Sequence, residues 1–278
     1  MPYNMVGSAS KQPSSFYLGS YNYTDVPDVQ NQQACASCYA FSIAASLSSV
    51  YSKTTGQHFT FSPQFIMDCI PVTGKIEEGG SGCWGGFPGE ALDFIIDVGS
   101  VIPVQLDYPY AGVQGRCDRS VRGVATGMTH YEHPNTTEQI KDAIMNHGAV
   151  SVATRVLQVH GAFKKFVPSS SFLPSFPGHL GVGVSCTLED STGEFTDHVV
   201  ILVGWAPCQI AVSVGATISS GDVHHIFTEA SHGCWIVQNS WGAKAGYQGL
   251  YFVNADPQFD CGIHAYALIP VIQTEVAT

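Results

Sequence analysis

A single cysteine at the start of an apolar stretch is the residue of this chain best placed to act as a nucleophile. Cys38 follows Ser37, a residue type that caps helices. It precedes apolar side chains with helical spacing, namely Tyr39, Phe41, Ile43, Ala44, Leu47, Val50 and Tyr51. The pattern predicts that Cys38 lies in the first turn of a buried helix. The partial positive charge and unpaired N–H groups at a helix start favour a thiolate, so we expect the pKa of the Cys38 thiol to be lowered. Gln32, on the preceding loop, is expected to aim an amide donor at the same point.

Two other interpretations fit the same stretch. Cys38 is consistent with a structural cysteine in a core helix. The segment from Cys35 to Cys38 is formally a C-x-x-C sequence, which is typical of thioredoxin-like redox sites. The residues of this stretch alone leave all three interpretations open.

A thiolate nucleophile needs a proton acceptor and usually a third group that orients the acceptor. Among eleven histidines, His198 is distinctive because it begins an apolar strand-like run, 199–204, that would hold it rigidly. Asn239 follows another such run, and Trp241 is placed to shield it from water. His198 and Asn239 are therefore the candidate partners of Cys38.

Composition restricts the class of protein. The chain has 278 residues, of which 45% are apolar and 12% are charged, against about 25% charged in an average domain. Its net charge of −11 argues against nucleic acid and anionic membranes as partners. No apolar run approaches the roughly 20 residues of a membrane span, and the polar residues 1–12 contain no signal-peptide core.

The cysteine count indicates an oxidising compartment. Nine cysteines are most simply divided into four disulfides and one free thiol, the candidate nucleophile. Sequons at Asn22 and Asn135 fit a secretory route and a glycoprotein.

The order of the elements predicts an α+β chain of two lobes. Residues 1–25 are expected to form an irregular N-terminal arm. Residues 26–120 form a helical lobe that carries the nucleophile, with helices from Cys38, from Ser62-Pro63 and over 90–98. Residues 121–278 form a β-rich lobe that carries His198 and Asn239. This lobe is predicted to contain one capped helix, 136–146, that starts in a capping box at 135–138, and strands at 150–154, 198–203, 234–237 and 249–253.

These motifs resemble those of the papain-like cysteine proteases, the cathepsin family. The signature C-G-[SA]-C-[WY] is matched by 35–39, with Ala36 in place of glycine. Six further motifs follow in family order: Asp68-Cys69, Gly82–Gly86, Pro109-Tyr110, Asp197-His198, Asn239–Gly242 and Cys261–Ile263. The resemblance implies a papain-like two-lobed fold, with a helical left lobe, a β-barrel-like right lobe and the active-site cleft between them.

The resemblance also implies roles for individual residues. Cys38 resembles the nucleophile, His198 the general acid and base, and Asn239 the group that orients the imidazole. Gln32 resembles the side-chain donor of the oxyanion hole, with the backbone N–H of Cys38 as the second donor. Trp241 resembles the indole that covers the histidine–asparagine contact.

Substrate-binding residues follow from the same resemblance. Gly85 and Gly86 match the loop that pairs with extended substrate backbone. The S2 pocket is expected to be formed by Phe87, Pro88, Ala153, Asp197 and Tyr266, a mostly apolar set that favours an apolar P2 side chain. The alternative is that Phe87 and Tyr266 are only core aromatics.

The disulfides implied by the resemblance are Cys35–Cys83, Cys69–Cys117 and Cys186–Cys261. They leave Cys38 unpaired, which disfavours the redox interpretation. Cys208 and Cys234 remain and are predicted to pair at the base of a hairpin-like insertion, 206–233.

The chain departs from the family pattern in several places. Ala245 and Leu250 stand where the family usually has Trp and Tyr. The spacing from Cys38 to His198 exceeds the roughly 130–150 residues typical of the family, so insertions are expected. The pair His224-His225 is similar to that of an exopeptidase occluding loop but lies in a different position, and no second ligand pair supports a zinc site.

The function predicted from the sequence is a cysteine endopeptidase that cleaves peptide bonds through a thioester, without metal or organic cofactor. Its expected partners are peptide or protein substrates and a propeptide or protein inhibitor in the cleft. Its expected location is lysosomal, vacuolar or secreted. The alternatives are an exopeptidase with a partly blocked cleft and a non-catalytic papain-fold binding protein, whose usual mark is a lost nucleophile.

Overall fold

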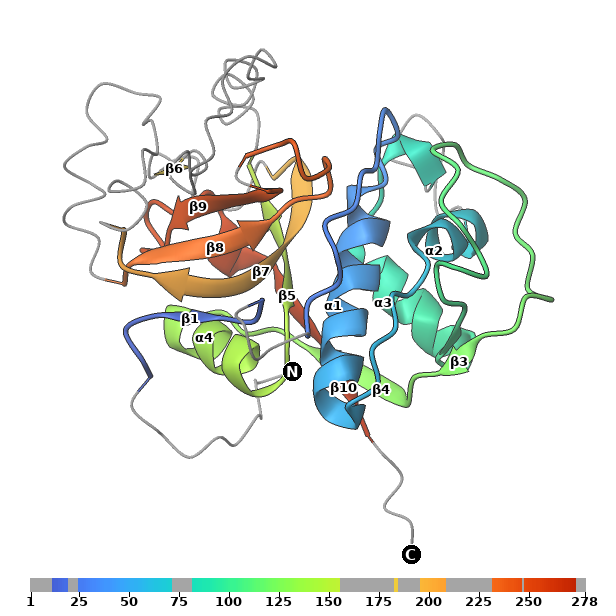
Figure 1. The fold of residues 1–278 in the computed structure, drawn as a ribbon, viewed down its shortest axis with the longest axis horizontal. Helices are drawn as coiled ribbons and strands as arrows, with labels where there is room; N and C mark the ends of the chain where they lie inside the picture. The colour runs from blue at the N-terminus through green and yellow to red at the C-terminus, as the bar shows by residue number, and fades with distance from the viewer. Residues whose placement is uncertain are drawn as a thin grey trace, which may run out of the picture.

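The computed structural model describes residues 12–19, 25–71, 82–155, 183–184, 196–208, 232–246 and 248–273. Helices predominate in the first part of the chain and strands in the second, and the two parts lie side by side as two lobes (Figure 1). The helices are α1 (Cys38–Thr55), α2 (Pro63–Cys69), α3 (Pro88–Asp97) and α4 (Thr137–Asn146). Single 3₁₀ turns occur at Gly82–Trp84 and Ile263–Ala265.

The strands form one large sheet and one small ribbon. The large sheet has the order β4-β10-β5-β7-β8-β9-β6, and β1 pairs with β7 beside this path. Its strands are β1 (Phe16–Tyr17), β4 (Met128–Glu132), β5 (Val150–Thr154), β6 (Gly183–Val184), β7 (His198–Ala206), β8 (Cys234–Gln238), β9 (Leu250–Asn254) and β10 (Ala267–Ile272). The ribbon pairs β2 (Val101–Ile102) with β3 (Val124–Ala125).

Helix α1 begins at Cys38 as predicted, but the Ser37 side chain does not cap it. Ser37 has φ −95° and ψ 19°, and its hydroxyl lies 2.9 Å from the Tyr110 hydroxyl instead of bonding to the first turn. The other end follows the local signal, because Gly56 adopts a left-handed conformation with φ 72° and donates its N–H to the Ser52 carbonyl. The proposed helix cap is therefore replaced by a long-range contact at the residue before the nucleophile.

The caps of α2 and α4 are local. The Ser62 hydroxyl accepts the Phe65 N–H at 3.0 Å, as the Ser62-Pro63 signal predicts. In α4 the Thr136 hydroxyl accepts the Gln139 N–H, and the Gln139 side chain accepts the Asn135 N–H. The capping box is thus one residue later than predicted, because the extended backbone of Thr136 points its hydroxyl at the first turn.

The sheet of the β-rich lobe is open in the described residues, where the expectation was a barrel-like lobe. It ends at β4 on one side and at β6 on the other. Strand β4 pairs with β10 but also packs against α3, and β10 packs against α1. The β10 and β4 edge of the sheet therefore lies beside the helices α1 and α3 (Figure 1).

Residues 16–17, within the segment predicted as an irregular arm, form strand β1. Phe16 and Tyr17 pair with Trp205 and Gly204 of β7, and the next residue, Leu18, is fully buried. The Phe16 ring stacks on Trp205 at 5.3 Å. Gly204 permits this approach, because a Cβ atom at its position would clash with the Phe16 backbone.

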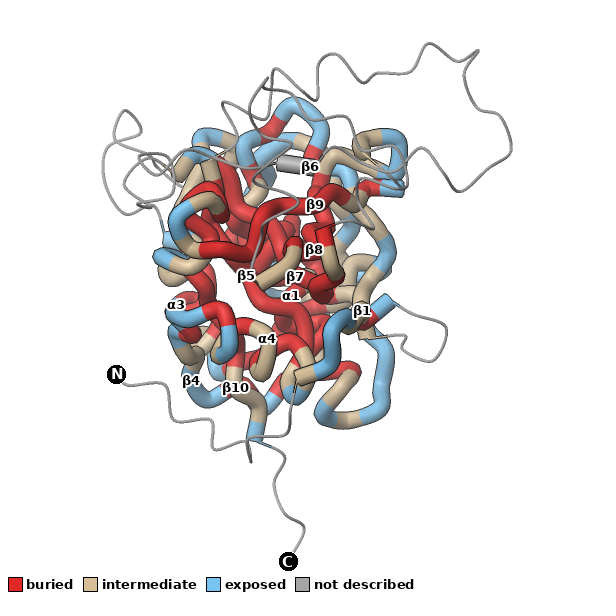
Figure 2. Tube along the Cα trace, turned by 90° about the vertical axis from the view of Figure 1, so that its left-hand side faces the viewer, coloured by how far each residue is buried: buried red, intermediate tan, exposed pale blue. Residues whose placement is uncertain are grey.

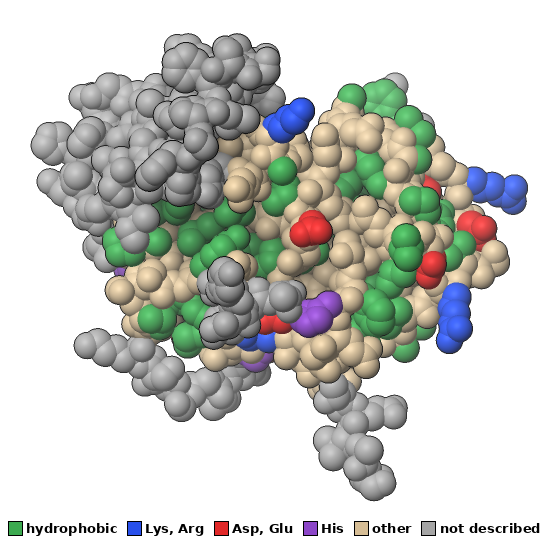
Figure 3. Space-filling view, in the orientation of Figure 1, with side chains coloured by type: hydrophobic (Ala, Val, Ile, Leu, Met, Phe, Trp, Pro, Cys, Tyr) green, Lys and Arg blue, Asp and Glu red, His purple; other side chains and the backbone are tan. Residues whose placement is uncertain are grey.

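Each lobe has its own apolar core, and the buried residues form a continuous interior behind the exposed loops (Figure 2). The sheet-side core includes Trp205, Trp235, Leu202, Val237 and Ile144. The helical core includes Tyr39, Leu47, Phe61, Ile66 and Leu92. On the face shown in Figure 3, charged side chains are scattered over the described residues, in keeping with the low charged content of the chain.

Buried serines of α1 connect the two cores. The Ser42 hydroxyl donates to the Val200 carbonyl at 2.7 Å, and the Ser46 hydroxyl donates to the Ala149 carbonyl at 2.6 Å. Ser49 accepts the Ala149 N–H at 2.8 Å. Because these bonds satisfy buried polar groups, they fix the helix that begins with Cys38 against the sheet that contains β7, the strand that begins with His198.

Three predicted disulfides are present, namely Cys35–Cys83, Cys69–Cys117 and Cys208–Cys234. Cys261 is also disulfide-bonded, and its predicted partner Cys186 lies outside the described residues. Cys38 is the free cysteine of the described part of the chain. None of the described helices is both long and apolar enough to cross a lipid bilayer.

Replacing Ser46 tests the connection between the lobes. Ser46→Ala removes the donor to a buried carbonyl, so we expect the free energy of unfolding to fall by about 1–3 kcal/mol. The measurement is equilibrium unfolding in urea, with the exposed Ser15→Ala as the matched control, expected within about 0.5 kcal/mol of the parent. Equal stability of the two variants would contradict the structural role given to Ser46.

Candidate active site

A buried hydrogen bond joins His198 to Asn239. His198 Nε2 lies 2.8 Å from Asn239 Oδ1, and these residues are only 7% and 4% exposed. The Ser240 N–H donates to the same Oδ1 at 2.8 Å, which identifies that atom as the amide oxygen. The imidazole must therefore donate from Nε2, and Nδ1 is left as the nitrogen able to accept a proton.

Adjacent strands bring this pair together from distant parts of the chain. His198 is the first residue of β7, and Asn239 follows the last residue of β8. The two strands are antiparallel, with Ile201 opposite Gln238. The Trp241 ring packs over the imidazole with centroids 4.8 Å apart, which limits the access of water to the His198–Asn239 bond.

Cys38 lies against the same end of β7. The backbone of Val199, the residue after His198, and the backbone groups of Tyr39 and of Cys38 itself act on the sulfur and lower the pKa of the thiol. Val199 also belongs to the apolar cluster of the helical lobe against which Cys38 packs. The start of α1 and the start of β7 therefore form one site across the boundary of the lobes.

The net effect of these surroundings on the thiol is the reverse of the prediction. Burial raises the pKa of the Cys38 thiol above its ordinary value, and the negative charge of Asp197 acts in the same direction. The backbone hydrogen bonds lower the pKa but do not outweigh burial. The predicted lowering by the helix end alone is wrong, because the helix start is covered by the other lobe and loses its water.

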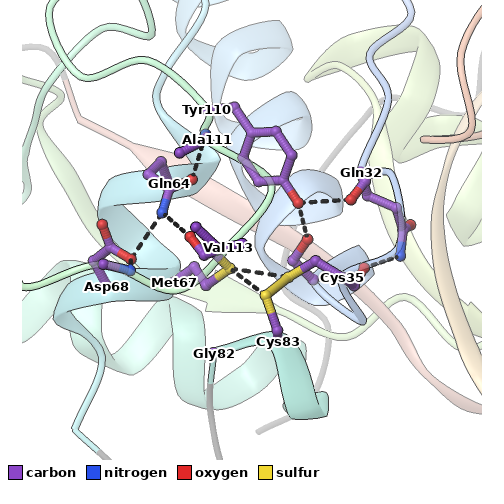
Figure 4. Close-up of a disulfide and its surroundings, with 12 residues drawn as sticks. Gln32, Cys35, Gln64, Met67, Asp68, Gly82, Cys83, Tyr110, Ala111 and Val113 are labelled. Carbon is purple, nitrogen blue, oxygen red and sulfur yellow. Dashed lines mark hydrogen bonds between the residues drawn. A yellow bond between two sulfur atoms is a disulfide. The ribbon is translucent and has the colours of Figure 1, made fainter.

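Gln32 is fixed at both ends of its side chain. Its Nε2 donates to the Cys35 carbonyl at 2.8 Å, and its Oε1 accepts the Ser240 hydroxyl at 2.6 Å. Its backbone N–H donates to the Ser240 carbonyl, and its backbone carbonyl accepts the Tyr110 hydroxyl. Figure 4 shows Tyr110 and Gln32 beside the Cys35–Cys83 disulfide. The side chain is 6% exposed and retains one N–H for a further acceptor.

The glycine-rich loop is attached to the nucleophile loop. The Cys35–Cys83 disulfide joins them, and the Ala36 N–H donates to the Cys83 carbonyl at 3.1 Å. Tyr39, whose pKa burial raises to about 12, accepts the Gly82 N–H at 2.9 Å. A Cβ atom at Gly86 would lie 2.9 Å from the Tyr39 ring, so the close packing of the loop requires glycine there.

The residues predicted for S2 come from both lobes. On the sheet side the Ala153 N–H donates to the Tyr266 carbonyl, and the Asp197 N–H donates to the Thr154 carbonyl, so these positions are neighbours. Phe87 and Pro88 lie at the start of α3 in the helical lobe. Phe87 is 62% exposed and Tyr266 is 51% exposed, which excludes the alternative that they are core aromatics.

Some predicted features fall outside the described residues. They include most of the insertion at 206–233 and the pair His224-His225. The two ends of the insertion are described, and the Cys208–Cys234 disulfide holds them together. In the described part of the chain, no group of three or more His, Cys, Asp or Glu side chains is placed to hold a metal ion.

Two residues of the site had no individual role in the sequence analysis. Ser240 and Tyr110 belong to matched motifs, but only the structure shows that both are hydrogen-bonded to Gln32. The available signal was their position inside those motifs. Their bonds join residues far apart in sequence, and local patterns do not reveal such partners.

The two-lobed α+β fold and the Cys38, His198 and Asn239 positions define a class of proteins in which a cysteine faces a histidine–asparagine pair. The chain matches the family described as "Papain family cysteine protease" over residues 12–271. Cathepsin S from Bos taurus is 29% identical over 249 residues, covering 89% of this chain and 62% of the relative. Cathepsin S from Rattus norvegicus is 27% identical, covering 98% of this chain and 71% of the relative.

A solved structure shows the same fold. The bromelain protease from Ananas comosus, in complex with the E64 inhibitor, superposes with a TM-score of 0.65 at 23% identity, covering 94% of this chain and 100% of that chain. This chain belongs to the papain family of cysteine proteases. The matched part of this chain covers 60–62% of the length of several of its curated relatives.

Proposed function

We propose that this protein is a cysteine endopeptidase that hydrolyses peptide bonds through a thioester. The observation that supports this most directly is the buried His198–Asn239 hydrogen bond, set beside a cysteine whose sulfur contacts the residue after His198. Asn239 orients the imidazole so that Nδ1 is available to Cys38. A non-catalytic binding protein would have no need for Cys38, His198 and Asn239 in this arrangement.

The reaction proceeds in two halves. The Cys38 proton moves to His198, and the thiolate attacks the carbonyl carbon of the substrate, forming a C–S bond and an oxyanion. The oxyanion collapses as the C–N bond breaks, and His198 gives its proton to the leaving amine. In the second half His198 takes a proton from water, the hydroxide attacks the thioester, and the C–S bond breaks to release the acid.

Burial makes the proton transfer to His198 necessary. An isolated thiolate is disfavoured in this partly dry site, as the raised pKa of Cys38 indicates. A thiolate beside an imidazolium is an ion pair with no net charge, and each partner replaces part of the lost hydration of the other. Asn239 supports the imidazolium, and Trp241 protects the hydrogen bond between them.

The oxyanion is stabilised by Gln32 and the backbone N–H of Cys38. One Gln32 Nε2–H is engaged by the Cys35 carbonyl, and the second is free to donate to the developing charge. Loss of such a donor in other hydrolases lowers kcat by about 10²–10³.

An apolar P2 preference completes the proposal. The exposed rings of Phe87 and Tyr266 offer apolar surface beside the buried Ala153, while Gly85 and Gly86 present backbone for pairing with the substrate. The Asp197 side chain is exposed. The disulfides support a lysosomal, vacuolar or secreted location, and a propeptide or protein inhibitor would occupy the same cleft.

The nucleophile is tested with a covalent inhibitor and a matched variant. E64, the inhibitor in the bromelain complex, should label Cys38 and abolish hydrolysis of an internally quenched peptide blocked at both termini. Cys38→Ser should lose nearly all activity with unchanged thermal stability, because the substitution is small and the rest of the site remains.

The same assay separates the proposal from its rivals. Labelling of Cys38 with continued hydrolysis would refute its assignment as nucleophile. Cleavage only of peptides with a free terminus would identify an exopeptidase instead.

The P2 preference is tested with pairs of peptides that differ only at P2. Peptides with Leu, Val or Phe should have kcat/KM at least about tenfold higher than those with Arg, because the surface offers apolar contact of about 1–3 kcal/mol. A second series that varies only P3 is the control and should show a smaller spread. Equal rates for Arg and Leu at P2 would contradict this assignment of the pocket.

A further inference from the structure

A buried carboxylate holds the turn that leads to Tyr266. Asp260 is only 1% exposed and lies just before the 3₁₀ turn Ile263–Ala265. Its Oδ1 accepts the Gly262 N–H at 3.0 Å, and its Oδ2 accepts the His264 N–H at 3.0 Å. The His264 Nδ1 lies 3.0 Å from both carboxylate oxygens. Because an ionised carboxylate only accepts hydrogen bonds, this Nδ1 carries a proton and donates it to the contact.

Burial and hydrogen bonding act on both groups of this contact. Burial raises the pKa of the Asp260 carboxyl, although the hydrogen bonds from His264 and Gly262 act in the opposite direction. The hydrogen bond to Asp260 raises the pKa of the His264 imidazole, although partial burial of the ring opposes it. A carboxylate in this position therefore depends on donors from its own turn, and the His264 ring is the side-chain donor that the described residues place on it.

The backbone of the turn needs this support. Cys261 and Gly262 both have left-handed conformations, with φ of 62° and 83°. A residue with a side chain adopts this conformation at a cost in free energy, which the surrounding contacts must offset. The Asp260 carboxylate provides such contacts, because it binds the N–H groups of the first and third residues after Cys261.

The same turn is attached to a strand that contributes to the predicted S2 pocket. The Cys261 carbonyl accepts the Arg155 N–H at 3.0 Å, and the Tyr266 carbonyl accepts the Ala153 N–H at 3.0 Å. The chain is therefore fixed to β5 and its end at two points, and residues 262–265 between them are held by the buried carboxylate. Tyr266, which is 51% exposed, follows directly after this turn.

We propose that Asp260 and His264 are positioning residues that set the direction of the Tyr266 ring and thereby the preference for the P2 side chain. This inference rests on the proposed function, which places Tyr266 in the S2 pocket. Without the imidazole donor the buried carboxylate keeps only backbone donors, so the turn relaxes and the Tyr266 ring moves. Neither positioning residue has to touch the substrate, because the effect passes through the backbone of the turn.

The test compares two quenched peptides that differ only at P2, one with Leu and one with Gly. The Gly peptide has no P2 side chain, so it reports on every part of the reaction except the side-chain contact in S2. In His264→Ala the ratio of kcat/KM for Leu to kcat/KM for Gly should fall by about fivefold, which is part of the factor that an apolar pocket supplies. The loss should lie mainly in the KM of the Leu peptide, because the P2 contact is made in the ground state and in the transition state alike.

A matched variant restores the donor. The amide nitrogen of an asparagine lies close to the place of the imidazole Nδ1, so His264→Asn should recover most of the Leu-to-Gly ratio. Asp260→Asn weakens the contact from the other side and should lower the ratio as His264→Ala does. The exposed His130→Ala is the control and should leave the ratio unchanged. Thermal unfolding should show that all the variants are folded at the assay temperature.

A double-mutant cycle with Tyr266→Ala tests whether the effect passes through the Tyr266 ring. In the Tyr266→Ala background, His264→Ala should change the Leu-to-Gly ratio less than about twofold, because the group that it positions is absent.

The outcomes separate this inference from the proposed function. An unchanged ratio in His264→Ala and Asp260→Asn would overturn the positioning role and leave the proposed pocket intact. Equal losses for the Leu and Gly peptides, an undiminished effect in the Tyr266→Ala background, or no recovery in His264→Asn would also overturn it. A parent protein that cuts both peptides equally well would instead refute the S2 assignment, and this inference with it.

Discussion

The chemistry of this site depends on a half-buried thiol where two lobes meet. The helical lobe supplies Cys38, and the backbone of Val199, near the start of β7 in the other lobe, acts on its sulfur. Removing water disfavours an isolated thiolate, and the N–H groups at the start of the helix do not compensate. We propose that a cation stabilises the thiolate and that His198 supplies it. Its neighbour Asn239 and the covering ring of Trp241 hold the imidazole in the orientation that makes it available.

This arrangement requires that the two lobes do not shift relative to each other, since the Cys38–His198 pair spans them. Hydroxyl groups of α1 provide part of the connection, with Ser42 and Ser46 bonded to backbone carbonyls of the sheet side. Near the reacting atoms, Ser240 of the sheet side bonds to Gln32 of the helical side. The Cys35–Cys83 disulfide then joins the nucleophile loop to the glycine-rich loop. Covalent and polar links therefore converge on the residues next to Cys38.

The sequence indicated much of this structure because many signals are local. Ser62-Pro63 and Gly56 mark helix ends through contacts within a few residues, and the helix start at Ser62-Pro63 is found where predicted. The family resemblance supplied the long-range disulfides Cys35–Cys83 and Cys69–Cys117. The Cys208–Cys234 disulfide was predicted from the two cysteines left over at the ends of the insertion. The roles of the catalytic residues remain proposals, although His198 and Asn239 are bonded as that resemblance implied.

The features that the sequence did not reveal are those set by distant partners. Ser37 is of a residue type that caps helices, but its hydroxyl is hydrogen-bonded to that of Tyr110, 73 positions away. Phe16 and Tyr17 form a strand only because β7 offers a glycine at the point of approach. The direction of the Cys38 pKa shift depends on burial by the other lobe, which no local pattern contains.

The most direct measurement of the central claim is the pH dependence of Cys38 alkylation by iodoacetamide in the parent protein and in His198→Gln. A raised thiol pKa means that the thiolate appears only above the ordinary cysteine range unless a cation accompanies it. The parent should therefore react rapidly at neutral and mildly acidic pH. Its plot of alkylation rate against pH should show an inflection in that range, caused by the imidazole of His198. His198→Gln should show one inflection, above the ordinary thiol pKa. Rapid alkylation of His198→Gln at neutral pH would contradict the account, because the helix start alone would then stabilise the thiolate.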